Sequence, residues 1–340
     1  MSDSPTENPL VSIVLPTYNR AHVLPYAIRS VLGQTYKNLE LIIVDDNSSD
    51  GTRAVVDSFH DGRLRYLRNE PNLKLPRALN KGFAAAKGAY LTWTSDDNMF
   101  TEDAIEKMVA VLRAGNCGFV YADYYLFAET DAAGKPLDAR HEKLPSRLQL
   151  ERTNHIGACF LYTRNAYEEV GEYDPELFLV EDYDYFIRIA QRFSFCHIPE
   201  PLYFFRRDDE TLYCSRFCEV KAADVLVRYK NGLLTDEQAL DAVVALILQN
   251  TEALKNPLLR WSRRLVRNVS FRLTKLHRQM CGKYLLAHMG RSVKRILEGF
   301  RTGQTTFEEA KKMLMTLMQQ EGSVAYMRPA FLESSPVGKN

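Results

Sequence analysis

The chain has 340 residues, of which 46% are hydrophobic and 26% charged, and its formal net charge is +1. This length and apolar content suffice for one large domain with an extension, or for two domains, and they exclude a disordered protein. A nearly neutral chain gives no global reason to bind nucleic acid or an acidic partner. The N-terminus has no basic flank followed by an apolar stretch, so no signal peptide is expected and a cytoplasmic location is predicted.

The cysteines are scattered along the chain, and no two of them form a Cys-x-x-Cys pair. Their spacing indicates neither a zinc site nor a disulfide framework. Reduced and mostly buried thiols are therefore the expected state. The six positions are Cys117, Cys159, Cys196, Cys214, Cys218 and Cys281.

Apolar runs alternate with helical patterns over the first third of the chain. Strands are predicted at Leu10–Leu15, Leu39–Val44, Leu64–Leu67 and Gly88–Ser95, and helices at Ala21–Leu32, Leu75–Lys87 and Thr101–Gly115. Strands that alternate with helices of this length favour an α/β fold, a mostly parallel sheet with helices on both faces. Open sheets of this kind place their ligands at the carboxyl ends of the strands.

The rhythm changes after Val120. The expected elements are strands at Tyr121–Ala128, Ala158–Tyr162 and Leu202–Phe205 and a helix at Glu181–Arg192. The polar residues 129–152 read as a binding loop. Beyond Cys218 the strand signals stop, and capping boxes at Thr235/Gln238 and Thr305/Glu308 predict helices. The predicted organisation is a disordered N-terminus (1–9), an α/β domain (10–215) and a helical C-terminal extension (216–340).

Two aspartates, Asp96 and Asp97, follow the last apolar run of the first third. Two carboxylates at a strand end need a cation, and Mg²⁺ is often shared between carboxylates and substrate phosphates. The alternative is a plain acidic turn, because Asp-Asp-Asn is good turn chemistry. A second pair, Asp45-Asp46, ends the second strand at the same sheet edge. Two such pairs on successive parallel strands favour a site.

Further polar residues surround this sheet edge. The first strand ends in Pro16-Thr17-Tyr18-Asn19-Arg20, directly before a helix. Tyr18 could stack on a flat base, while helix-terminal amides and Arg20 favour negative charge. Lys74 and Arg77 lie at the start of a helix and could meet a diphosphate. For Lys74, a solvated helix face is the favoured alternative.

In combination and in this order, the motifs resemble those of family 2 glycosyltransferases with the GT-A fold. The matching pieces are Leu15-Pro-Thr-Tyr-Asn-Arg, Val44-Asp-Asp-Asn-Ser-Ser-Asp-Gly-Thr, Leu79-Asn-Lys-Gly, Gly88-Ala-Tyr-Leu with Ser95-Asp-Asp-Asn, and Val180-Glu-Asp-Tyr-Asp-Tyr-Phe-Ile-Arg. The resemblance covers about Leu10 to Arg207, and within the family it is greatest to the spore-coat polysaccharide enzyme. It implies a nucleotide-diphospho-sugar transferase-like catalytic domain.

The resemblance also implies a nucleotide-sugar donor, usually UDP-linked, a divalent metal, Mn²⁺ or Mg²⁺, and inversion at the anomeric carbon. It assigns the donor side to residues at the strand ends: Pro16 and Tyr18 to the nucleoside, Asp46 to the uracil N–H, Asp96 to the ribose and Asp97 to the metal. A cation that bridges the phosphates would stabilise the charge of the leaving nucleotide.

Direct inversion needs a base on the face opposite the leaving diphosphate, and Asp182 matches the base of the family. It lies in the first turn of a predicted helix, from which its side chain could reach a cleft. Glu181 and Asp184 are the competing carboxylates, and a structural role is expected for Asp184. The alternative for the whole cluster is ordinary helix-start chemistry.

One departure from the family concerns the metal side. Many relatives carry a His two residues after an Arg in the last strand region, and here the matching position is Asp208. Either the alignment is shifted at this point, or Asp208 or Arg206 makes the contact with the phosphates in place of the His, or that contact is absent. His155 could contact the acceptor or be structural. Processive members have membrane helices and Gln-x-x-Arg-Trp; Arg260-Trp261 lacks the Gln, so transfer of single sugars is predicted.

Residues 255–301 contain thirteen Lys or Arg residues and one acidic residue, Glu298. An apolar stripe from Leu258 to Tyr284 runs beneath these charges at helical steps. A basic amphipathic helix suits an anionic membrane surface, on the inner face of the membrane. Packing on the catalytic domain or on a second copy of the chain is the favoured alternative, and no motif supports binding to RNA.

The predicted function is metal-dependent, inverting transfer of one sugar from a nucleotide-sugar donor to a glycan or lipid-linked acceptor, in cell-surface glycan or polysaccharide biosynthesis. A nucleotidyltransferase is the first rival, but it would be expected to have a Gly-rich loop after the first strand, and residues 16–20 contain no Gly. The second rival, a noncatalytic scaffold, would be expected to lose acidic motif residues. The main ones are present.

Overall fold

The structure is a computed structural model, and it describes residues 8–249 and 289–321. The chain divides into two compact units, Met1–Asp208 and Asp209–Asn340. In the described part of the chain, every strand belongs to the first unit and the second unit is helical.

The first unit contains nine strands and six helices within its described residues. The strands are β1 (Val11–Thr17), β2 (Leu39–Asp45), β3 (Leu64–Arg68), β4 (Tyr90–Trp93), β5 (Met99–Phe100), β6 (Phe119–Phe127), β7 (Arg140–Glu142), β8 (Phe160–Thr163) and β9 (Phe195–Arg206). The helices are α1 (Leu24–Leu32), α2 (Thr52–Asp57), α3 (Lys74–Ala85), α4 (Ala104–Arg113), α5 (Arg164–Val170) and α6 (Glu181–Ala190).

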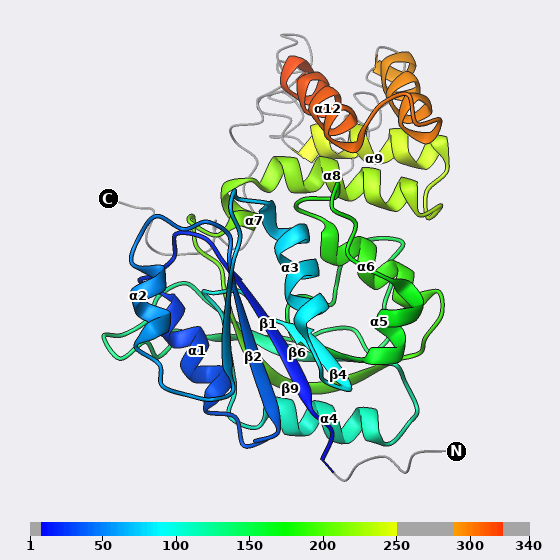
Figure 1. Ribbon diagram of the computed structural model, residues 1–340. Helices are drawn as coiled ribbons and strands as arrows, with labels where there is room; N and C mark the ends of the chain where they lie inside the picture. Colours follow the sequence, from blue (N-terminus) through cyan, green and yellow to red (C-terminus); the bar gives the residue numbers. More distant parts are fainter. Residues whose placement is uncertain (1–7, 250–288, 322–340) are drawn as a thin grey trace. The chain divides into compact units, whose positions relative to one another are not determined.

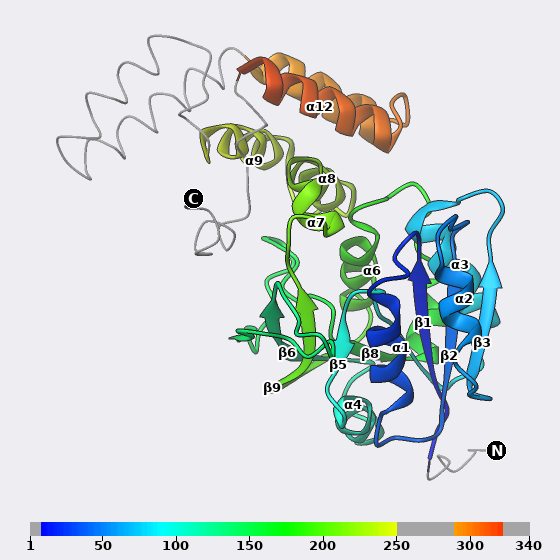
Figure 2. The same ribbon diagram turned by 90° about the vertical axis from the view of Figure 1, so that its left-hand side faces the viewer.

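The strands form one mixed sheet in the order β3-β2-β1-β4-β8-β6-β9-β5, and β7 pairs with β6 (Figures 1 and 2). The first four strands pair in parallel, as the alternation of strands and helices predicted. Beyond β4 the pairings with β8, β7 and β5 are antiparallel, while β6 and β9 pair in parallel. The α/β class with flanking helices is therefore confirmed, with a sheet that is mixed.

Helices cover both faces of the central strands. The side chains of Val11, Ile13 and Leu15 in β1 join one apolar core with buried residues of α1 and α4. On the opposite face, α3 lies so close that a Cβ on Gly82 would be 2.3 Å from Cγ1 of Val14. This explains why β1 and β2 are buried at every position, as expected for parallel strands between two helical layers.

The structure differs from the sequence prediction most in the second half of the sheet. Strand β9 begins at Phe195, seven residues before the predicted start. Pro199 and Pro201 interrupt the strand pattern in the sequence, and the register with β6 shifts between Ala122 and Asp123, opposite Pro201. A bulge is where a strand can accommodate proline. The short elements β5, β7 and α5 carry too few residues for a periodic signal.

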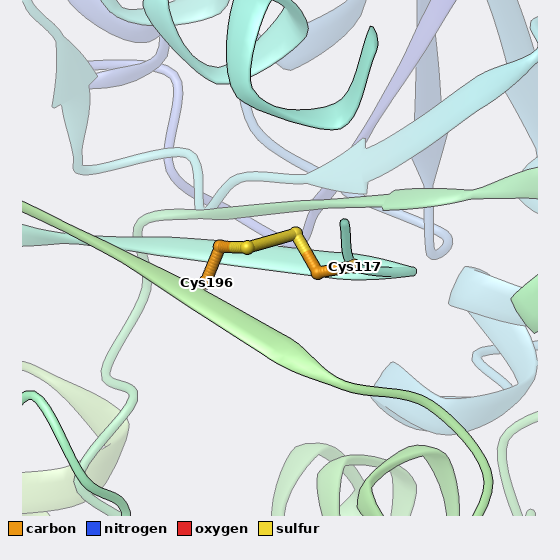
Figure 3. Close-up of a disulfide and its surroundings, with 2 residues drawn as sticks. All are labelled: Cys117 and Cys196. Carbon is orange, nitrogen blue, oxygen red and sulfur yellow. A yellow bond between two sulfur atoms is a disulfide. The ribbon is translucent and has the colours of Figure 1, made fainter. Parts of the chain in front are cut away.

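Cys117 and Cys196 form a disulfide (Figure 3). The expectation of reduced thiols is therefore wrong for this pair. Cys117 lies two residues before β6, and Cys196 is in β9, which pairs with β6 in the register Phe119 to Phe195. Their Cα atoms are 6.0 Å apart although 79 residues separate them in sequence. Only the strand pairing brings them together.

The carboxylate of Asp123 connects three strands. It is buried in β6 and lies 2.7 Å from Nε2 of His197 in β9 and 2.9 Å from Nε2 of His141 in β7. The N–H of Leu144 also donates to it, at 2.9 Å. Burial tends to raise the pKa of Asp123, but the amide and the two histidines prevail and lower it. This network anchors part of the segment that was predicted to be a binding loop.

All regular elements in the described residues of the second unit are helices. Its helices are α7 (Leu212–Ser215), α8 (Phe217–Lys230), α9 (Asp236–Gln249), residues 289–301 and α12 (Phe307–Glu321). The predicted capping box at α9 is confirmed, because Thr235 N donates to Gln238 Oε1 and Gln238 N to Thr235 Oγ1.

The capping box predicted at Thr305 and Glu308 is wrong by one residue. Thr306 and Glu309 form it instead, with Thr306 N donating to Glu309 Oε2 and Glu309 N donating to Thr306 Oγ1. The buried Phe307 is the first residue of α12, so Thr306 directly precedes the helix and takes the capping position.

Most of the basic segment 255–301 and its apolar stripe lie outside the described residues. None of the described helices offers the eighteen sufficiently apolar residues that a bilayer crossing requires.

Gly82→Ala tests the close packing of α3 on the sheet. We expect the added Cβ to collide with Val14 and to lower the free energy of unfolding by about 1–3 kcal/mol. Gly62→Ala is the control, since a Cβ there meets nothing within 4 Å, and it should change stability by less than about 0.5 kcal/mol. Equilibrium urea unfolding measures both, and equal stabilities of the two variants would contradict the packing.

Candidate active site

The site is built where the chain reverses direction across the sheet. From β1 the chain continues to β2 and β3 on one side, and it returns to the other side of β1 with β4. The carboxyl ends of β1 and β4 therefore meet at a topological switch point, the usual ligand position of an open α/β sheet. There Thr17 Oγ1 donates to Asp96 Oδ2 at 2.7 Å.

Arg20 neutralises the acidic pair that follows β4. Its NH2 lies 2.7 Å from Asp97 Oδ2, and its Nε lies 3.9 Å from Asp96 Oδ1. The side chains of Arg20, Asp96 and Asp97 are only 19%, 12% and 11% exposed, respectively. Ion pairs that are this well shielded from water are screened much less than surface pairs.

The turn that carries Arg20 is fixed on both sides. Asn19 has a φ of +54°, in the left-handed region that asparagine tolerates better than most residues. Its N–H donates to Ser48 Oγ at 2.9 Å, and its side-chain oxygen accepts from Ser49 N at 2.8 Å. The loop after β2 thus holds the loop after β1 in place.

Burial and charge shift the pKa values of the acidic pair. Burial raises the pKa of Asp96 to about 7, and the neighbouring Asp97 adds to the rise, while Thr17 and Arg20 oppose it. Burial also raises the pKa of Asp97, against the opposing effect of Arg20 and then of Arg206. Burial and mutual repulsion disfavour the ionised forms of these two carboxylates, and additional positive charge nearby would stabilise those forms.

The end of β9 borders the same carboxylates. Arg206 Nε forms an ion pair with Asp208 Oδ2, and Arg206 N donates to Asn98 Oδ1 at 2.8 Å. Asp208 contributes to the rise in the pKa of Asp97. The position at which the resemblance predicted a His therefore carries a carboxylate, Asp208, within electrostatic range of Asp97.

The second acidic pair has structural partners. Asp45 is fully buried and accepts hydrogen bonds from Tyr66 OH at 2.6 Å, Arg68 NH1 at 3.1 Å and Ser48 N at 2.7 Å. These bonds connect the end of β2 to β3 and to the loop that positions Asn19.

Asp46 holds the turn before α3. Its carboxylate accepts from Asn69 Nδ2 and Leu73 N at 2.8 Å and from Lys74 N at 2.7 Å. Lys74 has a φ of +67°, which these bonds sustain. A nucleobase whose N–H donated to Asp46 would therefore find a carboxylate that backbone amides already hold in place.

Arg77 does not pair with the acidic clusters in this structure. It forms an ion pair with Glu176 at 2.9 Å and donates to the carbonyl of Pro175 at 3.2 Å. Asn80, also in α3, exchanges two hydrogen bonds with the backbone of Tyr173. Helix α3 is thus joined to the segment that leads into α6.

The two residues predicted to contact a nucleoside lie at the same strand end. Pro16 is buried within β1, and Tyr18, just after the strand, is 51% exposed. An exposed ring beside the switch point is available for stacking on a planar base.

His155 lies in the segment before β8, and burial lowers its pKa.

Asp182 lies in the first turn of α6 and is partly buried. Its Oδ1 accepts from Tyr183 N at 2.7 Å and its Oδ2 from Asn154 Nδ2 at 3.1 Å. Burial raises its pKa to about 6, and these two donors and the charge of Arg207 oppose the rise. A carboxylate with this pKa is ionised at neutral pH and is basic enough to accept a proton.

The neighbouring carboxylates have other work. Glu181 is buried, and its Oε2 accepts from Leu179 N at 2.8 Å. Asp184 is fully buried and forms an ion pair with Arg188 Nε at 2.7 Å. Of the three acidic residues that open α6, Asp182 is the most exposed.

The acidic residues offer oxygen ligands, which suit Mg²⁺ and Mn²⁺. Within residues 8–249 and 289–321, however, no group of three or more His, Cys, Asp or Glu side chains is arranged to hold a metal ion. Such a set of residues does not by itself enclose a metal ion, and it fits only a cation that would take most of its ligands from another molecule.

Two interactions could not be found from the sequence patterns. The first is the ion pair of Arg20 with both aspartates, since 76 or 77 residues separate the partners. The second is the hydrogen bond from Asn154 to Asp182, which depends on the path of a loop without periodic signal. The only sequence hint for Arg20 is its place directly after a strand end.

Solved structures confirm the architecture. The protein is similar to TarS 1-349 of S. aureus, with a TM-score of 0.55 at 16% identity, over 87% of this chain and 92% of that one. It is also similar to the mannosyltransferase PcManGT of Pyrobaculum calidifontis, with a TM-score of 0.56 at 16% identity, over 93% and 88% of the two chains. At these identities the likeness establishes the fold alone.

Curated relatives match over shorter segments. The UDP-Glc:alpha-D-GlcNAc-diphosphoundecaprenol beta-1,3-glucosyltransferase WfgD of Escherichia coli is 35% identical over 126 residues, 37% of this chain and 50% of that protein. The uncharacterized glycosyltransferase RT0329 of Rickettsia typhi is 33% identical over 194 residues, 55% and 60% of the two chains. The matches thus span about half to three fifths of these relatives.

The family match covers the strands that build the switch point. Residues 12–171 match the model described as Glycosyl transferase family 2. This range includes Arg20, Asp46 and the pair Asp96-Asp97, and it ends before α6 and Asp182. The first unit of this chain is therefore similar to the family 2 glycosyltransferases over the strands that carry the two acidic pairs.

Proposed function

We propose that the protein transfers a single sugar from a nucleotide-sugar donor, UDP-linked, to a hydroxyl of a glycan or lipid-linked acceptor, with inversion and with a divalent metal. One observation carries the proposal: Asp97 and Asp182 lie within electrostatic range of two consecutive arginines, Arg206 and Arg207, at the end of β9. Asp97, the proposed metal ligand, and Asp182, the proposed base, therefore lie near the same end of the sheet.

On the donor side, Tyr18 would stack on the nucleoside and Asp96 would hold the ribose. Arg20 and the amides before α1 would provide positive charge for the diphosphate, and Arg77 would do so after leaving its ion pair with Glu176. A divalent cation bound by Asp97 and the phosphates would stabilise the charge that develops on the leaving nucleotide. The raised pKa values of Asp96 and Asp97 support a pair that gains from added positive charge.

On the acceptor side, Asp182 would take the proton of the attacking hydroxyl as the new glycosidic bond forms. The hydroxyl oxygen attacks the anomeric carbon, the bond to the diphosphate breaks, and the proton moves to Asp182. Each oxygen of Asp182 already accepts one hydrogen bond and can still accept another from a sugar hydroxyl.

The relatives support a nucleotide-sugar donor. The name of the E. coli relative gives UDP-Glc as donor and a diphosphoundecaprenol-linked sugar as acceptor. TarS 1-349 has been solved in complexes with UDP and with UDP-GlcNAc, and PcManGT in a complex with GDP-Man and Mn²⁺. For this chain, a UDP-sugar and Mn²⁺ or Mg²⁺ are the proposal that follows.

The two rivals find less support. A nucleotidyltransferase or a noncatalytic scaffold could share the sheet, but neither requires a carboxylate with a raised pKa across from the acidic pair. Retention of Asp46, Asp96, Asp97 and Asp182 together favours catalysis. A peripheral position at the membrane, through residues 255–301, would suit a lipid-linked acceptor.

Replacing Asp182 by Asn removes the proposed base with little change in shape. We expect kcat/KM to fall by about 10²- to 10⁴-fold, while UDP binding, measured by titration calorimetry, stays unchanged. Asp57→Asn, an exposed position on α2, is the control and should retain full activity. Full turnover of Asp182→Asn would reject the assignment.

The pH dependence of transfer follows from the pKa of Asp182, which is about 6. The base works in its ionised form, so activity is present above this pKa and lost as the pH falls through it. We expect kcat/KM to decrease about tenfold for each unit below pH 6. A rate profile that stays flat down to pH 5 would contradict this role.

Asp97→Asn tests the metal ligand. Ligand binding to the native state raises its stability by about 2.7 kcal/mol at a hundred times the Kd. In thermal-shift assays with UDP, we expect Mn²⁺ to add to the stabilisation of the unmodified protein and of Asp57→Asn, but not to that of Asp97→Asn. An equal Mn²⁺ increment in all three proteins would exclude Asp97 as a ligand.

A further inference from the structure

We propose that Asn154 is the positioning residue of the catalytic base: its amide orients the carboxylate of Asp182 and favours the ionised form. The inference rests on the function proposed above, in which Asp182 removes the acceptor proton. Asn154 lies outside the motifs that suggested the function, in the segment before β8.

The hydrogen bonds of Asn154 fix which end of its amide faces the base. Asn154 Nδ2 donates to Asp182 Oδ2 at 3.1 Å, and Asn154 Oδ1 accepts from Ile156 N at 3.2 Å. The reversed amide would set its oxygen against a carboxylate and its NH₂ against an N–H. Both contacts would be repulsive, so a donor is always presented to Asp182.

The backbone around Asn154 is held firmly. Ile156 is fully buried. Gly157 has a φ of +66°, and a Cβ there would lie 2.5 Å from the ring of Tyr124. Two N–H groups, those of Arg152 and Thr153, donate to the carbonyl of Gln149. The amide of Asn154 is therefore offered from a rigid support and not from a loose loop.

A second contact already ties this segment to α6. The hydroxyl of Tyr183, a buried residue, donates to the carbonyl of Leu150. Neither that bond nor the burial of Ile156 involves the side chain of Asn154, so both attachments are expected to remain when Asn154 is replaced. The direct effect of the bond from Asn154 falls on the carboxylate of Asp182.

The backbone at the start of α6, which carries Asp182, is also held in place by hydrogen bonds. Leu179, just before α6, has a φ of +87°, a strained conformation that its bond to the Glu181 carboxylate sustains. Asp182 Oδ1 receives the N–H of Tyr183, and Oδ2 receives the amide of Asn154. Each donor favours the charged carboxylate over the neutral acid.

Several charged or titratable groups face Asp182. Arg207, just after the end of β9, favours the ionised form of Asp182. The charge of Asp182 in turn contributes to the raised pKa of Tyr173. Glu181 and Asp184 flank Asp182 on its own helix, where each is engaged elsewhere. Among the neutral side chains, Asn154 supplies the hydrogen bond that opposes the effect of burial.

The test measures the titration of Asp182 directly. In the full chain labelled with ¹³C-carboxyl aspartate, the signal of Asp182 is identified by its absence in Asp182→Asn. We expect Asn154→Ala to raise the pKa of Asp182 by about one unit, the size of one hydrogen bond to a charged group. Asn154→Asp should raise it further, because a second carboxylate opposes ionisation.

Asn165→Ala is the matched control, since Asn165 also donates to a carboxylate, that of Glu169, but on the exposed face of α5. It should leave the Asp182 titration unchanged. In transfer assays, the acidic limb of kcat/KM should move upward by the same amount in Asn154→Ala, and raising the pH should restore most of the lost rate. A purely structural defect would not be repaired by pH.

An Asp182 titration that Asn154→Ala leaves in place would overturn the proposal, whatever happens to the rate. If the titration moves while the acidic limb of transfer stays, Asn154 acts on Asp182 as inferred and the role of Asp182 as base is what fails. The two hypotheses are thereby separated.

Discussion

Two adjacent carboxylates, the buried Asp96 and the partly buried Asp97, follow the end of β4, and their mutual repulsion is a constraint that the surrounding strand ends must balance. The positive charges of Arg20, after the end of β1, and of Arg206, at the end of β9, offset this repulsion. Arg20 can do so only because Asn19 adopts a left-handed turn that the loop after β2 holds. Three strand ends are thus committed to balancing one pair of charges, and a diphosphate with its cation would enter a setting already built for charge.

Asp182, the proposed base, lies in a different physical environment. Helix α6 is fixed by aromatic packing, with the ring of Phe186 set edge-on against Phe119 and Phe160. Hydrogen bonds rather than ion pairs govern Asp182 itself. A proton acceptor must change its charge during turnover, and a close permanent ion pair would oppose that change. Neutral donors favour the ionised form more gently, which leaves the pKa of Asp182 near 6.

Local patterns predicted the parts of the fold that depend on local physics. The apolar runs of β1, β2 and β4 and the polar residues after them placed Asp96 and Asp97 at a strand end, and the sheet order brought them beside Thr17. Patterns did not reveal contacts made across long separations, such as the disulfide Cys117–Cys196 or the bond from Asn154 to Asp182. The disulfide depends on the pairing of β6 with β9, and the bond from Asn154 to Asp182 depends on the path of the loop before β8; no periodicity encodes either of them.

The end of β9 explains how two carboxylates with opposite requirements can share one site. Successive side chains of a strand point to opposite faces. Arg206, the last residue of β9, acts on Asp97, and Arg207, whose N–H still pairs with Phe127 of β6, acts on Asp182. One backbone segment thereby places positive charge near both Asp97 and Asp182. Because the sheet fixes that segment, Asp97 and Asp182 each have an arginine nearby that favours the ionised form and so opposes the effect of burial on the pKa.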